Sequence, residues 1–267
     1  MTVRFKSISA LVLATALGLL TQSQAGQAGD SIEVLVGRAA PNVRWDNGKL
    51  TGYWVELSRL AAQKANVPIQ DFLNLPYQRS LQEVAGGSRQ CHPFVARTPK
   101  HEPSYRWIAP TRRIVTTVFV TTDLRNPPAT IEDLKYHEIA VQRGTQGDQT
   151  LEQLGIPATR ISDTSRLAIL LANHRVSVFV AEYASGFAAA KEASVAVKEV
   201  MPLAETIGYF VCSPSIDSAT ADRLTKAIDD IFSSGLDRPL AVADGMDPQI
   251  YDRVRPPALA ATVQPTQ

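Results

Sequence analysis

The sequence predicts an α/β fold, and three observations support this prediction. Short apolar stretches that suit β-strands alternate with stretches whose apolar residues recur at helical spacing. Through the first hundred residues the order is β-α-β-α-β, which is typical of a sheet covered by helices. The alternation starts again near residue 114, so the sequence indicates two α/β units.

The first unit begins with a buried strand, followed by a loop rich in Asn, Asp and Gly. Asn66 and Pro68 end its first helix, and Gly86 and Gly87 close its second. Thr98 with the next proline predicts one more helix start, with Thr98 as the N-cap. The stretches are, in order, strand "SIEVLVGRA", loop "PNVRWDNGKLTG", helix "YWVELSRLAAQKANV", strand "IQDFLNLPY", helix "QRSLQEVAGGS" and strand "QCHPFVA".

The second unit opens with a strong β stretch from Ile114 to Thr122. Thr130 is the predicted N-cap of its first helix, with Asp133 three residues later. The chain then continues with helix "NPPATIEDLKYH", strand "EIAVQRGT", helices "QGDQTLEQLG" and "RISDTSRLAILLANH", strand "VSVFVAEY", late strand "TIGYFVCS" and amphipathic helix "SATADRLTKAIDDIFSSGLDRPLAVADG". Residues 255–267 have the composition of a flexible C-terminal tail.

The composition excludes some classes of protein. The 267 residues carry a net charge of +1 and no block of like charges, which argues against a nucleic-acid partner. No compact metal motif, P-loop, dinucleotide fingerprint or nucleophile elbow is present, so we expect no metal and no cofactor.

The N-terminus has the pattern of a secretory signal peptide over residues 1–25. Arg4 and Lys6 precede an apolar stretch, Ile8 to Leu20, and a Ser-x-Ala cleavage site follows it. An N-terminal membrane anchor is the alternative, although 13 apolar residues are short against the roughly 20 that span a bilayer. Cleavage predicts an exported, soluble protein of the periplasm. In that compartment the two cysteines, Cys91 and Cys212, favour a disulfide over two buried thiols.

Several phrases in their order resemble one family. They are "LTGYWVELSRLAAQKANV", "YQRSLQEVAGGSRQCHPFVARTPKHEPSYRWIAP", "EIAVQRGTQGDQTLEQLG", "VSVFVAEYASG" and "TIGYFVCSPSIDSATADRLTKAIDDIFSSG". The chain resembles bacterial periplasmic solute-binding proteins of the polar amino-acid-binding class (family 3), the substrate-binding subunits of ABC importers. The resemblance implies a two-lobed, type II periplasmic-binding-protein-like fold with a hinge and an interlobe cleft. Lobe 1 is expected at 26–118 plus 207–254 and lobe 2 at 119–206. The strands carrying Cys91 and Cys212 would lie side by side.

The resemblance also implies ligand-binding residues. The family's Thr-x-x-Arg segment, whose Arg grips a ligand carboxylate, corresponds to Thr98 and, in the Arg position, to His101. An imidazole is a weaker anion partner unless protonated, which places an amino-acid ligand in doubt. Arg79 or Arg97 could take over the anion, although Arg97 could equally point into solvent.

Other expected ligand-binding residues come from the second unit and from aromatic side chains near strand ends. Glu182 stands where the family often has an Asp for a ligand ammonium, or is a solvated acid at a strand end. Gly144 and Thr145 would present polar groups at a helix start, or form a plain turn. Trp45 and Tyr77 could contact an apolar or planar ligand part.

The sequence therefore predicts a monomeric, non-enzymatic binding protein for a small polar ligand, either amino-acid-like or an organic anion. It would serve an ABC importer or a membrane sensor. An enzyme on the same fold, similar to cyclohexadienyl dehydratase, and an interaction module with a degenerate cleft remain as alternatives.

Overall fold

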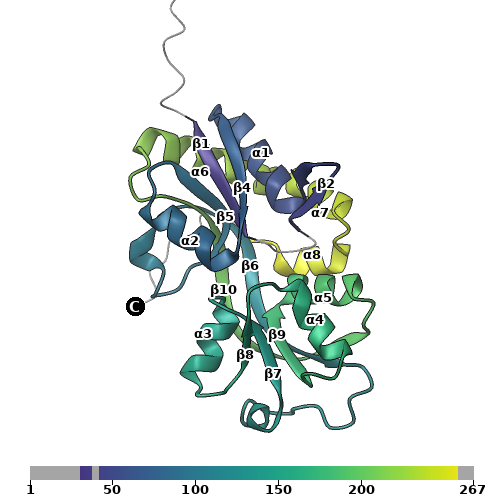
Figure 1. The fold of residues 1–267 in the computed structure, drawn as a ribbon. Coiled ribbons are helices and arrows are strands. Elements are labelled where there is room, and N and C mark those ends of the chain that lie inside the picture. The colour runs from purple at the N-terminus through teal and green to yellow at the C-terminus, as the bar shows by residue number, and fades with distance from the viewer. Residues whose placement is uncertain (1–30, 38–41, 258–267) are drawn as a thin grey trace, which may run out of the picture.

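One eight-stranded mixed sheet runs through the whole molecule in the computed structural model, which describes residues 31–37 and 42–257 (Figure 1). Its strand order is β4-β1-β5-β10-β6-β9-β7-β8. A separate two-stranded hairpin consists of β2 and β3. The strands are β1 (Ile32–Gly37), β2 (Arg44–Asp46), β3 (Lys49–Thr51), β4 (Ile69–Leu75), β5 (Gln90–Ala96), β6 (Arg106–Thr121), β7 (Ile139–Gln142), β8 (Thr159–Ile161), β9 (Val178–Glu182) and β10 (Val197–Cys212).

Helices cover both faces of this sheet. In the upper half of Figure 1, α1 and α6 pack together on one face and α2 covers the other. In the lower half, α4 and α5 cover one face and α3 the other. The helices are α1 (Tyr53–Ala65), α2 (Tyr77–Gly86), α3 (Gln146–Gln153), α4 (Ser165–Ala172), α5 (Tyr183–Glu192), α6 (Ser218–Ser234), α7 (Asp237–Ala243) and α8 (Pro248–Val254), with the 3-10 helices η1 (Glu102–Ser104) and η2 (Glu132–Tyr136).

Two long antiparallel strands, β6 and β10, join the two halves. They pair along their whole length, from Val197 opposite Thr121 to Cys212 opposite Arg106. At one end β10 also pairs with β5, and at the other end β6 pairs with β9. The upper and lower halves have separate hydrophobic cores, so the chain has a two-lobed α/β fold. We call the half built on β1, β4 and β5 the first lobe, and the half built on β7, β8 and β9 the second lobe.

The disulfide expected from the sequence is present between Cys91 and Cys212. The two residues face each other across the antiparallel pair of β5 and β10, and both side chains are fully buried. Because both strands belong to the first lobe at this point, the disulfide ties the returning strand β10 to that lobe. It does not cross to the second lobe.

The segment after β5 differs from its prediction. No helix begins at Thr98: the Thr98 carbonyl accepts the backbone N–H groups of His101 and Glu102, and the 3-10 helix η1 starts one turn later with His101 as its N-cap. The Thr98 hydroxyl is buried without a hydrogen-bond partner, so the predicted side-chain cap is wrong. A turn closed by a backbone carbonyl satisfies the same N–H groups that the side chain was expected to satisfy.

Some other elements also differ from their predictions. The strand expected from Ile114 begins at Arg106, because pairing with β10 extends it. The helix expected after Thr130 is only the 3-10 helix η2, although the Asp133 carboxylate does accept the Thr130 amide. The long C-terminal helix breaks at Gly235, whose φ of 73° ends α6 before α7. The sequence prediction also lacked the β2–β3 hairpin, β8, and the helices α5 and α8.

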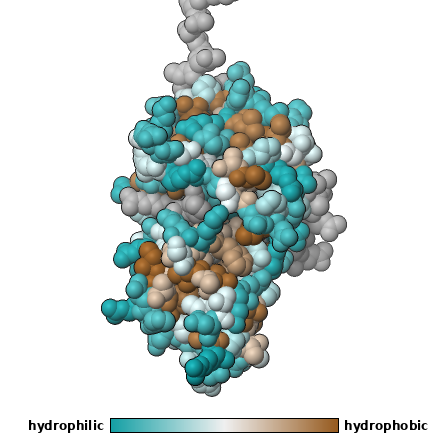
Figure 2. Space-filling view, turned by 90° about the vertical axis from the view of Figure 1, so that its right-hand side faces the viewer, coloured by the Kyte–Doolittle hydropathy of each residue, from teal (hydrophilic) through white to brown (hydrophobic). Residues whose placement is uncertain are grey.

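No helix among the described residues is long and apolar enough to cross a membrane. Figure 2 shows the face on the right-hand side of Figure 1, where hydrophilic side chains cover much of both lobes and smaller groups of hydrophobic side chains appear in both halves. Single exposed apolar residues such as Ile169 on α4 are ordinary for a globular protein. The signal peptide predicted for 1–25 and most of the predicted tail, 258–267, lie outside the described residues.

Candidate functional site

A cavity of about 70 Å³ lies where residues of both lobes meet near β6. The described residues that line it come from α2, β5, β6, β7, α3, α4, β9 and α5. They are Tyr77, Phe94, Ala96, Ile114, Thr116, Gln142, Thr145, Gln146, Gly147, Thr164, Leu167, Val180, Ala181, Glu182 and Ser185. Residues of both lobes therefore lie on opposite sides of one small space.

The two lobes line the cavity with different chemistry. The first lobe supplies mainly apolar surface, including Tyr77 and Phe94. The second lobe supplies most of the amide, hydroxyl and carboxylate groups. Gln142 is fixed by two hydrogen bonds, donating to the Ser162 carbonyl and accepting from the Thr164 hydroxyl. A molecule bound between the lobes would therefore meet an apolar wall on one side and polar partners on the other. Because ligand pockets usually measure about 300–1,000 Å³, the lobes would have to move apart to admit it.

The N-terminus of α3 reaches the cavity. Thr145 is its N-cap, and its side chain accepts the Asp148 amide. Gly144 precedes it with a φ of +78°, a backbone conformation that glycine adopts readily. The Gly144 amide donates to the Asp148 carboxylate. The next two residues, Gln146 and Gly147, line the cavity, and their first-turn N–H groups have no acceptor within the helix. This end of α3 is therefore a source of hydrogen-bond donors for a polar ligand.

Glu182 ends β9 and is the N-cap of α5. Its Oε2 atom accepts the Ser185 amide at 2.8 Å and the Ser185 hydroxyl at 2.7 Å, which fixes the carboxylate. Its Oε1 atom is buried and has no hydrogen-bond partner among the described residues. Because a buried carboxylate oxygen without a partner is costly, Oε1 is a ready acceptor for a ligand group.

Arg112 on β6 lies beside Glu182 and is not among the ligand-binding residues predicted from the sequence. The Arg112 Nη1 atom is 3.8 Å from Glu182 Oε2. Its guanidinium carbon lies 4.5 Å from the centre of the Trp54 ring, 5.2 Å from that of Tyr53 and 5.7 Å from that of Phe94. The sequence did contain a signal for this residue, since Arg112 and Arg113 are adjacent and precede an apolar β stretch. Side chains alternate between the two faces of a strand, so one arginine must turn inward if the other faces water.

Three of the residues selected from the sequence, Tyr77, Thr145 and Glu182, line the cavity together. Burial strongly raises the pKa of the Tyr77 hydroxyl, so this ring stays neutral. Gly144 sits one residue before the lining part of α3, and a side chain there would collide with Gln78.

The two arginines expected to hold an anion lie elsewhere. Arg79 is two-thirds exposed beside Glu83 on α2. Arg97 forms two hydrogen bonds with the Glu102 carboxylate, and that carboxylate's pKa is lowered by the pairing. Neither side chain is among the residues that line the cavity. Arg97 instead lies over the rings of Trp107 and Tyr209.

His101 and Thr98 also lie outside the cavity lining. The His101 ring bonds through Nδ1 to the Ala96 carbonyl at 3.0 Å, and burial lowers its pKa. A neutral imidazole that is held by a backbone carbonyl offers little to an anion. The histidine in the family's arginine position is therefore part of the packing of this segment.

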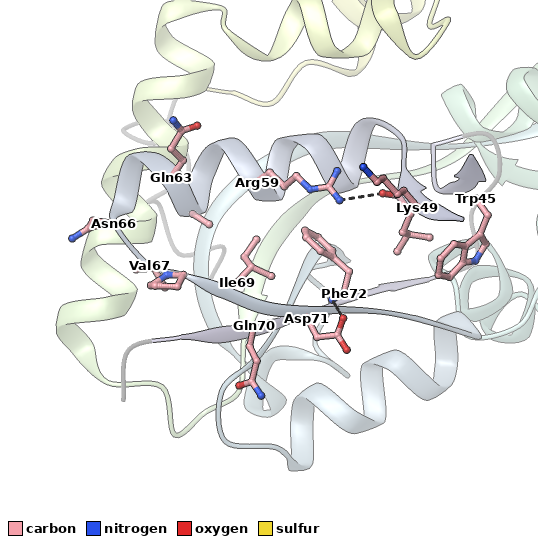
Figure 3. A pocket seen from close by; sticks show the side chains of 13 residues that line it. Trp45, Lys49, Arg59, Gln63, Asn66, Val67, Ile69, Gln70, Asp71 and Phe72 are labelled. Atoms are coloured by element: carbon pink, nitrogen blue, oxygen red, sulfur yellow. Dashed lines mark hydrogen bonds between the residues drawn. The ribbon is translucent and has the colours of Figure 1, made fainter. Parts of the chain in front are cut away.

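Trp45 lies in another surface feature. A more open groove of about 670 Å³ runs between α1, the β2–β3 hairpin and the edge strand β4 (Figure 3). Trp45 is 63% exposed at one end of it. Arg59 within the groove is already bonded to Glu56 and to the Leu50 carbonyl. Among the described residues no group of three potential metal ligands lies close enough to bind an ion.

Solved structures with this fold include several ligand-binding proteins. A histidine kinase sensor domain with similarity to periplasmic binding proteins aligns with a TM-score of 0.72 at 19% identity, over 81% of this chain and 96% of that chain. The arginine-, lysine-, histidine-binding protein ArtJ of Geobacillus stearothermophilus aligns at 0.70 and 18% identity, over 83% and 98%. A mutant of ArgBP from T. maritima aligns at 0.71 and 18% identity, over 81% and 95%.

No protein-family model matches the sequence, and no curated protein matches it. At these low identities the structural alignments establish the fold. The chain therefore has the two-lobed fold of the periplasmic binding proteins, over nearly the whole length of the proteins it resembles.

Proposed function

We propose that this protein binds a small polar ligand in the cavity between its lobes, without catalysing a reaction. The observation that carries this proposal is the Glu182 carboxylate, which lines the cavity with one buried oxygen that has no partner. The α3 N-terminus and the Gln142 and Thr164 side chains add polar groups near it. A ligand satisfies these groups by donating a hydrogen bond to Glu182 and accepting one from α3.

The charge of the cavity lining favours an amino-acid-like ligand over a simple organic anion. Of the described residues that line the cavity, Glu182 alone carries a charge, and that charge is negative. A ligand ammonium would compete for it with Arg112, which lies 3.8 Å away, while a ligand carboxylate beside it would be repelled. Similar structures described as an arginine-binding protein and as the substrate binding protein of an amino acid ABC transporter support the same ligand class.

The cellular setting is part of the proposal. The protein would be exported to the periplasm after loss of residues 1–25, work as a monomer and deliver its ligand to an ABC importer or a membrane sensor. The likeness to a transporter subunit and to a sensor kinase domain supports both partners. We propose lobe boundaries after residues 118 and 206, within the two long strands that join the lobes.

Thermal unfolding with a panel of amino acids, amines and organic acids tests this proposal. A ligand at a hundredfold excess over its Kd would raise the Tm by about 5–10 °C through linkage. The same compound should stabilise Glu182→Gln much less. Mass spectrometry of each stabilising mixture must show the compound unchanged. Turnover would favour an enzyme, and no stabilisation by any compound would favour an interaction module.

A further inference from the structure

The Arg112–Glu182 pair connects the two lobes through buried side chains. The side chains are only 3% and 10% exposed, and their closest charged atoms are 3.8 Å apart. Arg112 Nη1 and Glu182 Oε1 have no hydrogen-bond partners among the described residues. Glu182 has Arg112 as its paired cation, while Arg112 also acts electrostatically on the buried Asp237 of the first lobe.

Arg112 is fixed to the first lobe. Its guanidinium lies against the rings of Tyr53 and Trp54 at the start of α1 and of Phe94 on β5, and we call these three rings the Arg112 cage. Trp54 and Phe94 are stacked with centroids 4.7 Å apart, so the cage is rigid. Rings around a guanidinium attract it more strongly when water is excluded.

Glu182 is fixed to the second lobe. It follows Val180 and Ala181 of β9, which are buried in that lobe, and its carboxylate caps α5 through Ser185. The carboxylate can remain near Arg112 only while the two lobes stay together. Because Glu182 pairs with Thr116 on β6, a hinge movement between Arg112 and Thr116 would separate the two charges.

We propose that the Arg112–Glu182 pair is an interlobe lock that holds the cleft closed in the protein without ligand. When the lobes separate, water reaches both charges, and when they close, the Glu182 carboxylate depends on Arg112 for compensation. Removing one partner leaves the other buried alone and so disfavours the closed state. Glu182 also lines the cavity, so a ligand cation would compete with Arg112 for the same carboxylate. The lock does not depend on which ligand binds.

The neighbouring pair of Arg113 and Glu205 is a matched control. Its charged atoms are also 3.8 Å apart, and Arg113 is the next residue on the same strand. Its side chains are 45% and 57% exposed, so water compensates both charges in any arrangement of the lobes. Substitution of this pair should leave the lobes where they are.

Distances between spin labels, measured by double electron–electron resonance without ligand, test the proposal. Nitroxides at Gln82→Cys on α2 and Glu152→Cys on α3 place one label on an exposed site of each lobe. The native cysteines are joined in the disulfide, so labelling is confined to the added residues. We would compare the labelled wild type with four labelled variants. They are Arg112→Gln, Glu182→Gln, Arg113→Gln and the double variant that combines Arg112→Gln with Glu182→Gln.

The wild type and Arg113→Gln should give one short distance. Arg112→Gln should shift the distribution to longer values, and Glu182→Gln should shift it less because Arg112 keeps its cage. The shift of the double variant should be smaller than the sum of the two single shifts, since no lone buried charge remains.

Long distances in the wild type, unchanged distances in both single variants, or additive shifts would each overturn the lock. Circular dichroism identifies any variant that does not fold. If Arg112→Gln fails to fold, the distance distribution of Glu182→Gln tests the lock. This variant should fold, because the amide oxygen of the glutamine can still cap α5. Since no ligand is used, a failure here leaves the proposed ligand-binding function untouched.

Discussion

Two arginines near the cleft, Arg97 and Arg112, lie in opposite environments. Arg97 donates two hydrogen bonds to the Glu102 carboxylate, five residues later in the chain. The Glu102 carbonyl in turn accepts the indole N–H of Trp107, so these contacts stay within one segment. Arg112 lies in its aromatic cage with a partner 3.8 Å away and one unpartnered nitrogen. Arg97 is partly exposed, while Arg112 is buried.

The difference shows which kind of arginine is available for function. A guanidinium whose hydrogen bonds are satisfied within one segment stabilises that segment and has little left for a ligand or a partner lobe. A buried guanidinium with an unpartnered nitrogen and an ion-pair partner on the other lobe responds to any movement of that partner. The four predictions below test this contrast, from the largest expected effect to the smallest.

Loss of the disulfide should have the largest effect, because both arginine environments depend on β10. The Thr206 hydroxyl donates to the Arg97 carbonyl, and Gly208 lies opposite Arg112. Replacing Cys91 and Cys212 by alanine frees a loop of 121 residues in the unfolded chain. The free energy of unfolding should fall by about 4–5 kcal/mol in the chain-entropy model. Urea unfolding of the variant and of the oxidised wild type measures it. A loss under about 1 kcal/mol would mean that β10 is held without the disulfide.

Arg112→Gln should lower the free energy of unfolding by about 3 kcal/mol, because it leaves the Glu182 carboxylate buried without its counter-charge. Urea unfolding at pH 7 measures the loss. Arg113→Gln serves as the control and should cost less than about 1 kcal/mol, since its pair is exposed. Equal losses in the two variants would remove the contrast between buried and exposed arginines.

Acid should destabilise the strand beneath the cage through His92. Burial lowers the pKa of His92 to about 3, and its Nδ1 accepts the Phe94 amide at 3.1 Å. The unfolded imidazole binds a proton below its ordinary pKa of about 6.5, while the folded one does not, so stability is complete above that pH and falls below it. Between pH 7 and 5 this group should cost about 2 kcal/mol.

Urea unfolding at pH 7, 6 and 5 measures this loss of stability. His92→Asn retains an acceptor for the Phe94 amide and has no proton to gain, so its stability should depend less on pH. Equal pH dependence in the variant and the wild type would assign the acid sensitivity to another group, such as His101, whose pKa burial also lowers.

Arg97→Gln should have the smallest effect, about 1 kcal/mol or less, because an ion pair open to water contributes little. The Arg97 and Glu102 side chains are 39% and 48% exposed. Thermal unfolding of the variant and of the wild type, at low salt and in roughly 0.5 M salt, measures this loss of stability. The difference should shrink at the higher salt concentration, because salt screens exposed charges. A loss larger than that of Arg112→Gln would reverse the order of the two environments.

Much of the fold could be predicted from the sequence because its patterns are local. The strand "QCHPFVA" matches β5 in full. Asn66 ends α1 as expected, and the structure gives it a left-handed conformation. The two-lobed arrangement came from the resemblance to a known family. The helix α5 escaped prediction because its alanine-rich sequence has little periodicity. Pairing between β6 and β10 extends both strands beyond their apolar cores, and only the partner strand decides that length.

The candidate site was predicted less completely. Tyr77, Thr145 and Glu182 follow or precede strand and helix ends, which is where open α/β sheets place ligand contacts, and all three line the cavity. Arg97 and His101 match the family's segment in sequence, but their side chains turn to Glu102 and to the Ala96 carbonyl.

The sequence by itself determined the α/β class, the order of most elements and the presence of two cysteines, because propensity, periodicity and turn residues act over a few neighbouring positions. The tertiary structure alone decided which charges meet. Arg112 and Glu182 are 70 positions apart, and only the pairing of β6 with β9 and the packing of α1 and β5 bring them together in a space without water. Contacts between residues far apart in the chain depend on the whole fold, so no local pattern could reveal them.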